Sequence, residues 1–457
     1  MRADILAISL VMFTVMFTVL VQGAEADSAQ FDSDLDTPLD TPVSTLGEAL
    51  KELYQSNPLL NAARADVREA DAMVHEARGA FRPSVRTVVE GGRLNARRSQ
   101  RAQPSSTNVL DRHGVTLNIV QNLYNGGSDS AALRAARVDL QIAGHRLVST
   151  EQQLFLQGSI AFRAVIRDQR VRELNASNVE RLQNRLTAVQ DLFTVGQATP
   201  TELAQARSRL AIARADLARA QGELDASIAI FKQFVGLTPG ELVVPVLDFQ
   251  LPNTLDEALI IGQEENPDIL AAEGAVAGQR YRLRQARGDL LPDIDLRAQA
   301  SYIRDSVTSG DRSENLSLLG VVTIPIYQQG IQSSQVRGAR AQLQAREYQL
   351  LEARRVVEAT INSSWYQLQA RESAVEANRQ GVEAARIALQ GVGEENRIGE
   401  RSLLDVLDSE QDLRDAEVAL ENAMYDLLVA RLNLLHGLGQ LTFDRFAVML
   451  GMSADSN

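Results

Sequence analysis

The feature that most constrains the fold of this chain is an internal repeat. The residues TLGEAL at 45–50 recur as TLDEAL at 254–259, and an Asn-Pro pair at 57–58 recurs at 266–267, in each case 209 positions later. Beyond the next loop the separation falls to 203 positions and stays there. A single length change of six residues therefore reconciles the two halves. The chain is expected to contain two copies of one unit of about 200 residues.

The repeat and the composition of its flanks predict the domain organisation. An apolar run opens the chain, and it is followed by acidic residues with two prolines. The predicted segments are a signal peptide at 1–26, a disordered acidic lead-in at 27–43, a first structural repeat at 44–236, a linker at 237–253, a second structural repeat at 254–440 and a C-terminal tail at 441–457.

The N-terminus predicts export. Arg2 precedes an apolar run from Ile5 to Val21, and small residues follow at the positions that a signal peptidase reads. The run is short for a bilayer-spanning helix, and no later segment has the ~18 apolar residues that such a helix needs. An uncleaved membrane anchor remains the alternative. The chain has no cysteine, which excludes a lipidated N-terminus, disulfides and thiolate metal sites.

Each copy predicts the same order of elements. A short helix (45–56; 254–265) precedes a longer one (59–81; 268–290), two strands, a very long helix (128–194; 331–397) and a return helix (199–235; 402–437). The very long segments contain no proline and carry an apolar stripe at every seventh residue, which is typical of coiled coils. A helix of about 65 residues is on the order of 100 Å long. These helices are therefore expected to pack side by side as a rod or tube.

The runs between the helices have the period of β-strands. In DIDLRAQASYI, residues 293–303, apolar residues alternate with polar ones, and residues 115–119 alternate in the same way. Ten or so residues with one apolar face match a strand of a membrane-spanning barrel. Four strands cannot close such a barrel, and open edges in lipid leave backbone groups unpaired. We therefore expect oligomers, in which two protomers would give eight strands and three would give twelve.

The composition argues against an enzyme and against a nucleic-acid-binding protein. A net charge of −13 disfavours contacts with phosphates. The four histidines, His75, His113, His145 and His436, fall in unrelated elements, and the motifs of zinc proteases, P-loop proteins and serine hydrolases are missing. We predict no catalytic residue, no cofactor and no metal site.

One segment of the second copy, NRIGERSLLDVLDSEQDL, carries Asp405 and Asp408 on one helix face. Ser402 is an expected N-cap, and the helix dipole favours carboxylates near a helix N-terminus. A solvated helix face therefore explains both acids without a special function. Because Asp405 matches Glu202 and Asp408 matches Gln205 in the first copy, the acid pair is a feature of the second copy.

Together these features resemble the TolC family of outer-membrane efflux and secretion ducts, over roughly residues 44–440. The resemblance rests on the TLxEAL…NP opening of each copy, on the turns FTVGQATPTELAQAR and NRIGERSLLDVLDSEQDL, and on the strand-to-helix junctions LYNGG and IYQQG. The junction residues that it marks are Tyr124, Gly127, Tyr327 and Gly330.

The resemblance implies a mainly α fold with a β-barrel portion. Long antiparallel coiled-coil helices would form an α-barrel in the periplasm, and four strands from each protomer of a homotrimer would form a 12-stranded transmembrane β-barrel in the cell outer membrane, against outer-membrane lipid. The implied partners are a periplasmic adaptor (membrane fusion) protein and an inner-membrane pump, either proton-driven or of the ABC type. The implied function is a passive exit duct of a tripartite efflux or type I secretion system, opened at its periplasmic tip.

The resemblance also assigns roles at the tip. Asp405 and Asp408 would line a constriction, and Arg401 would bond to Thr201 and Glu202 of the first-copy turn. In a trimer the ring of aspartates would attract cations, repel anions and raise the pKa of its own members. The expected adaptor contacts are Val195, Gly196, Gln197, Ile398, Gly399 and Glu400.

Two alternatives remain open from the sequence. One is a duct of the same fold dedicated to polypeptide secretion, and the other is a soluble periplasmic coiled-coil scaffold without a barrel. Asn396 departs from family members that carry a tyrosine which ties the closed tip, so the sequence leaves the bonds that close the tip undecided.

The basic loop RLNARRSQRAQ, residues 93–103, is expected to face outside, towards lipid phosphates or water.

Overall fold

The structure, a computed structural model, describes residues 42–100, 103–245, 250–305 and 310–449, with the side chains of 96–108 and 447–449 left aside. These residues belong to one compact unit, Pro42–Asn457. The predicted signal peptide and most of the predicted acidic lead-in lie outside the described residues.

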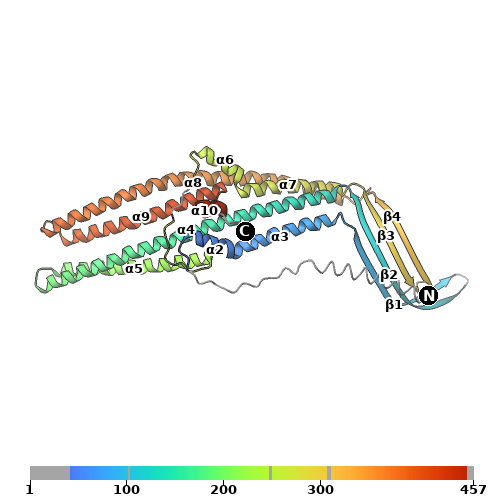
Figure 1. Cartoon of the computed structure of the whole chain (residues 1–457), viewed down its shortest axis with the longest axis horizontal. Coiled ribbons are helices and arrows are strands. Elements are labelled where there is room, and N and C mark those ends of the chain that lie inside the picture. Colours follow the sequence, from blue (N-terminus) through green and yellow to red (C-terminus); the bar gives the residue numbers. More distant parts are fainter. Residues whose placement is uncertain (1–41, 101–102, 246–249, 306–309, 450–457) are drawn as a thin grey trace. The chain divides into compact units, whose positions relative to one another are not determined.

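Both copies fold into the same order of elements (Figure 1). The first copy comprises α2 (Leu46–Ser56), α3 (Pro58–Gly79), β1 (Ser84–Gln100), β2 (Gln103–Asn125), α4 (Ser128–Thr194) and α5 (Pro200–Val235). The second comprises α6 (Leu255–Glu265), α7 (Pro267–Gly288), β3 (Asp293–Arg304), β4 (Arg312–Thr323), α8 (Ile331–Arg397) and α9 (Leu403–Leu438), followed by α10 (Phe443–Met449). α4 and α8 both have 67 residues, and α5 and α9 both have 36. The helices predicted from the repeat are confirmed.

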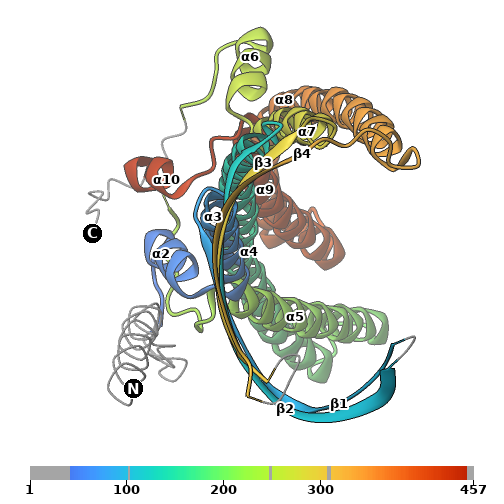
Figure 2. The same cartoon turned by 90° about the vertical axis from the view of Figure 1, so that its right-hand side faces the viewer.

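The long helices pack as two antiparallel hairpins, α4 with α5 and α8 with α9. α7 packs against both α4 and α8, and α3 packs against α4, so α3, α4, α7 and α8 lie side by side. Figure 2 shows these helices following an arc, with α2 and α10 on its outer side. The seven-residue stripe explains this packing, because its members turn inward at Leu154 and Ala161 of α4 and at Val357 of α8.

Two hydrophobic clusters stabilise the helices. The central core lies where α2, α6 and α10 meet the long helices, and its largest fully buried side chains include Phe155, Phe162 and Phe231. The tip core lies near the turns of the long helices. Its members are Leu182, Leu186, Val189, Ala206, Leu210, Ala213 and Leu407.

The Asn-Pro pair has the same structural role in both copies. Each asparagine is an N-cap, with its side-chain oxygen accepting the N–H of Leu59 or Asp268 at 2.9 and 3.0 Å. The side-chain nitrogen of Asn57 donates to the carbonyl of Phe234, and that of Asn266 donates to the carbonyl of Gly437, both at 3.0 Å. Each asparagine therefore joins the start of a middle helix to the end of a return helix.

The strands form one antiparallel sheet in the order β1-β2-β3-β4. β3 and β4 have 12 residues each, as the alternation predicts, but β1 has 17 and β2 has 23. The prediction of a loop at 93–103 is wrong for residues 93–100, which belong to β1 and continue its pairing with β2. Two cross-strand ion pairs lie where this extension begins, Arg93 with Asp111 at 2.8 Å and Arg112 with Glu90 at 3.4 Å.

The alternating apolar residues of the four strands gather mainly on one face of the sheet, although Val88, Leu110 and Leu319 lie on the other. In one row across the sheet Val85, Ile119, Ala298 and Leu318 are direct neighbours. This face is open, with Val85 64% and Leu318 68% exposed. Within the described residues β1 and β4 each pair with one strand only. An apolar face and two free edges would be unfavourable in water, so both need another surface to cover them.

Candidate functional site at the helix turns

The two turns between the long helices have the same backbone. In the first turn Gly196 has φ 75°, and the N–H of Gln197 bonds back to the carbonyl of Leu192 at 2.8 Å. In the second turn Gly399 has φ 84°, and the equivalent bond measures 2.9 Å. A left-handed glycine followed by such a bond is a Schellman ending, which only glycine adopts without strain. Both glycines therefore end their helices in left-handed caps.

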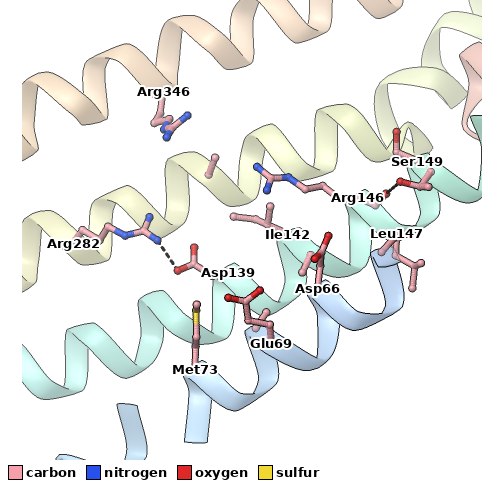
Figure 3. Close-up of a pocket in the computed structure, with 15 residues that line it drawn as sticks. Asp66, Glu69, Met73, Asp139, Ile142, Arg146, Leu147, Ser149, Arg282 and Arg346 are labelled. Carbon is pink, nitrogen blue, oxygen red and sulfur yellow. Dashed lines mark hydrogen bonds and ion pairs between the residues drawn. The ribbon is translucent and has the colours of Figure 1, made fainter. Parts of the chain in front are cut away.

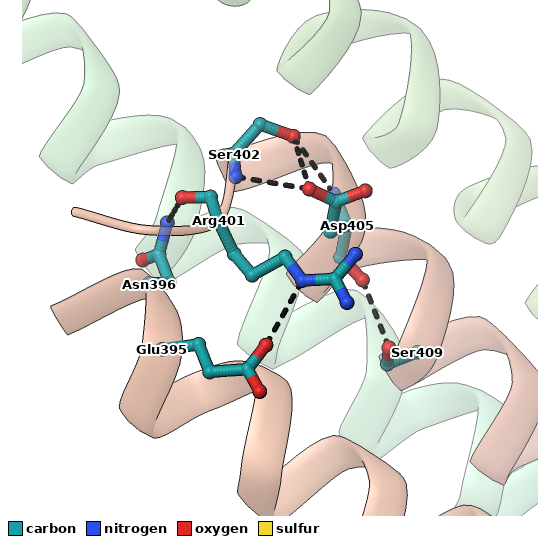
Figure 4. A network of polar contacts seen from close by, with 6 residues as sticks. All are labelled: Glu395, Asn396, Arg401, Ser402, Asp405 and Ser409. Carbon is teal, nitrogen blue, oxygen red and sulfur yellow. Dashed lines mark hydrogen bonds and ion pairs between the residues drawn. The ribbon is translucent and has the colours of Figure 1, made fainter. Parts of the chain in front are cut away.

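The return helices also begin alike. Thr199 and Ser402 are N-caps in capping boxes that Glu202 and Asp405 complete three residues later. The Asp405 carboxylate accepts from the Ser402 hydroxyl at 2.8 Å and from its N–H at 2.9 Å (Figure 4). The prediction of Ser402 as N-cap is confirmed. The acid that the two copies share is thus a capping residue, which leaves Asp408 as the acid peculiar to the second copy.

Ser402 also lowers the pKa of Asp405. Its hydroxyl and its N–H both donate to the ionised carboxylate, and they hold the pKa of Asp405 below its ordinary value. Within one protomer this direction is opposite to that expected for a ring of aspartates, because hydrogen bonds to the charged form outweigh the slight burial of the group. Asp405 is therefore ionised at neutral pH.

Arg401 and Asn396 close the second turn on itself. The Arg401 guanidinium donates to the Glu395 carboxylate at 2.9 Å, and the Asn396 side chain donates to the Arg401 carbonyl at 2.8 Å (Figure 4). In this protomer Glu395 takes the place expected for Thr201 and Glu202 as the partner of Arg401. A bond from Arg401 to the first-copy turn stays a prediction for the assembled protein.

The structure pairs Asp408 with a residue that the sequence reasoning missed. Arg209 of α5 donates from Nη2 to Asp408 Oδ1, and the two side chains are 32% and 50% exposed. The repeat carries a signal for this pair. At the separation of 203 residues Arg209 matches Asp412, so the first copy carries a cation where the second carries an anion.

More charged pairs join α9 to the first-copy hairpin farther from the tip. Arg414, whose side chain is 10% exposed, donates to Asn175 of α4 at 3.1 Å and lies 3.5 Å from the carboxylate of Asp216 on α5. Glu421 lies 3.9 Å from both Arg163 and Arg170 of α4. Buried charges of this kind require their partners, so they fix how α9 sits on the first-copy hairpin.

The other predicted residues fall into two exposed groups. At the tip Val195 and Ile398 are each 68% exposed, beside the exposed Gln197 and Glu400. At the strand-to-helix junctions Gly127 and Gly330 have φ 80° and 76° and precede α4 and α8. Tyr124 and Tyr327 are 47% and 83% exposed. The adaptor contacts and the roles of the junctions stay predictions.

A cavity of about 710 Å³ lies between α3, α4, α7 and α8 (Figure 3). Carboxylates of α3 face it from one side and guanidinium groups of α4, α7 and α8 from the other. Its charged residues are Asp66, Glu69, Asp139, Arg146, Arg282 and Arg346. Such mixed, solvent-accessible charge is typical of a wall that faces water.

Among the residues that the structure describes, no group of three or more histidine, aspartate or glutamate side chains is placed to hold a metal ion. None of the helices in this described part of the chain is both long and apolar enough to cross a membrane.

Comparisons with known proteins agree with this architecture. The model of the family described as "Outer membrane efflux protein" matches residues 49–236 and 262–440. Outer membrane efflux protein BepC of Brucella suis is 31% identical over 404 residues, which are 88% of this chain and 87% of BepC. Outer membrane protein TolC of Escherichia coli is 27% identical over 417 residues, 86% of this chain and 83% of TolC.

The fold has solved counterparts. The CmeC outer membrane channel of Campylobacter jejuni superposes with a TM-score of 0.78 at 16% identity, covering 87% of this chain and 86% of CmeC. At this identity the likeness is one of fold. It covers the helical hairpins and the sheet together, and so the predicted fold class is confirmed.

Proposed function

Because the chain belongs to the outer membrane efflux protein family, we propose that it is the passive exit duct of a tripartite export system, opened at its helical tip. It is an outer-membrane channel, and the soluble-scaffold alternative is set aside. Residues 1–26 direct export as a signal peptide, and the two repeats at 44–236 and 254–440 build the duct. The cargo is either a small toxic compound or a secreted polypeptide.

The observation that carries this proposal is the sheet with an exposed apolar face and two free edges. In lipid that face is favourable, but every edge N–H and carbonyl needs a partner. Copies of the chain provide both by pairing β4 of one protomer with β1 of the next. Three protomers give a closed barrel of twelve strands, which is the arrangement that the family resemblance implies.

The tip is the remaining part of the proposal. The turns at Gly196 and Gly399 present Val195 and Ile398 to the periplasm, where exposed apolar side chains beside polar ones suit a docking adaptor. An inner-membrane pump, proton-driven or of the ABC type, supplies the energy for transport through this passive duct. Adaptor docking would move the return helices outward and open the entrance.

The test is the conductance of the purified protein in planar bilayers. Replacing Asp405 and Asp408 together by alanine should raise single-channel conductance and lower cation selectivity, because it removes the ring of carboxylates. A matched control removes two exposed acids of α6, Asp256 and Glu264, and should change neither value. A heat-resistant trimer in the outer membrane is expected in all variants. A wild-type protein that forms no channel would refute the proposed function.

A further inference from the structure

The carboxylate of Asp408 is not free to act as an open charge at the tip. It accepts a hydrogen bond from Arg209, which reaches across from α5 to α9. Asp405, by contrast, is bonded to Ser402 in its own helix, and it keeps its charge without a cationic partner on another helix. The two aspartates of the predicted ring are therefore unequal, because only the charge of Asp408 is balanced by the first copy.

The charge pattern of the repeat is arranged for this contact. At the matched positions the first copy has Gln205 and Arg209, whereas the second has Asp408 and Asp412. If the two copies changed places in this contact, Asp412 would face Gln205, and an uncharged glutamine cannot form an ion pair with aspartate. The repeat therefore allows this ion pair only with the cation on α5 and the anion on α9.

A second pair between the same helices has the opposite polarity. Nearer the central core, α9 carries the cation Arg414 and α5 carries the anion Asp216, 3.5 Å apart. Along α5 the order from the tip is cation and then anion, and along α9 it is anion and then cation. If α9 slid along α5 towards the tip by the spacing between the two ion pairs, Arg414 would approach Arg209, and two cations would face each other. The crossed polarity therefore favours one register of the two helices.

We propose that Arg209 is a positioning and selectivity residue of the entrance. In the closed state it holds α9 against α5 and neutralises Asp408, whereas Asp405 has no ion pair with α5 among the described residues. When α9 moves away from α5, Asp408 is released and the entrance becomes more negative. The cargo that this entrance favours is then cationic or neutral rather than anionic. This inference rests on the proposed function, which places these residues at the entrance.

The expected effect on closure follows from the exposure of the pair. A partly exposed ion pair shifts an equilibrium by roughly 1.4- to 5-fold. If three protomers open together, the open-to-closed ratio of the trimer should rise by about 3- to 125-fold when the pair is removed. Arg209→Gln and Asp408→Asn both remove it, so both should raise the open probability.

The effect on selectivity separates a charge role from a merely structural one. Arg209→Gln leaves Asp408 charged and should raise the cation-to-anion permeability ratio, read from the reversal potential in a salt gradient. Asp408→Asn should lower the same ratio. The double variant Arg209→Asp with Asp408→Arg restores an ion pair and should return the open probability towards that of the wild type. Arg207→Gln, on the same helix, removes a charge for which the described residues provide no ion pair, and it should leave the open probability unchanged.

The outcomes distinguish this inference from the proposed function. If the wild type conducts but Arg209→Gln and Asp408→Asn shift the permeability ratio in the same direction, or not at all, Arg209 does not set the charge of the entrance. A swap variant that stays as open as the single variants would equally contradict the closure role. If the wild type forms no channel in bilayers, the proposed function fails first, and this inference with it.

Discussion

Replacement of Asn266 by alanine tests how the repeat is held together. Asn266 is 5% exposed, and it makes two different bonds, as N-cap acceptor for α7 and as donor to the carbonyl of Gly437. Loss of an N-cap costs about 1 kcal/mol. A buried carbonyl left without a donor costs about 1–3 kcal/mol more. We therefore expect the junction between α6, α7 and the end of α9 to lose about 2–4 kcal/mol of local stability.

Hydrogen exchange of the backbone amides measures this loss without unfolding the whole assembly. At tenfold per 1.4 kcal/mol, exchange at the start of α7 should accelerate by about 30- to 700-fold. Asn266→Ser separates the two bonds, because serine caps about as well as asparagine but lacks the amide nitrogen that donates to Gly437. It should accelerate exchange less than alanine does. The exposed Asn61→Ala is the control and should change exchange in α3 only slightly.

The repeat makes the prediction stricter. Asn57 makes the same two bonds in the first copy, and its donor bond to Phe234 has the same length. Asn57→Ala should therefore accelerate exchange at the start of α3 by a similar factor. Unchanged exchange in either alanine variant would refute the reasoning, as would a serine variant that exchanges faster than the alanine variant.

Two further predictions concern the junctions of the helices. Gly126→Ala should lower the yield of assembled protein in the outer membrane, because a side chain at φ 54° would overlap the carbonyl of Gly288, whereas Gly144→Ala, with open space around it, should not. Burial lowers the pKa of His436 although Asp268 opposes the shift, so His436 is neutral in the folded protein. Stability should be full above the ordinary histidine pKa of about 6.5 and fall as the pH drops below it. His436→Gln should flatten that fall in urea unfolding between pH 8 and 5, and the exposed His75→Gln should leave it unchanged.

The sequence predicted the helices well because each helical signal occurs twice. The elements predicted from the repeat differ from the observed helices by at most two residues at their ends. The alternation in 293–303 likewise predicted β3, since a strand with one apolar face shows its period locally. The helix-ending role of Gly196 and Gly399 and the N-cap at Ser402 follow from local backbone chemistry and were equally accessible.

What the sequence did not reveal depends on contacts between distant segments. The partner of Asp408 lies 199 residues away on a different hairpin, and although the repeat marks Arg209 by its match with Asp412, it does not show that Arg209 and Asp408 meet. Arg401 bonds to Glu395 because the turn brings them together, although the resemblance had directed attention to the first-copy turn. The extension of β1 beyond residue 93 depends on backbone pairing with β2, which neither strand shows alone. Periodicity is local, whereas the choice between competing charged partners is tertiary.

The repeat also indicates how the protomers meet. α7 packs between the two long helices α4 and α8. Its equivalent in the first copy, α3, packs against α4 but not against α8 within the described residues. On α8 several large apolar side chains are exposed, among them Leu351 and Val356 at 51% and 53%, and on α3 Leu59 is 63% exposed. If the rule of the repeat continues between protomers, α3 of one chain fills the place beside α8 of its neighbour that α7 fills beside α4. β4 and β1 then meet as β2 and β3 do. In a ring built in this way the contacts between chains are nearly equivalent to those within a chain. The exposed faces of α8 and α3 would then form between protomers the kind of contact that α4 and α7 form inside one protomer.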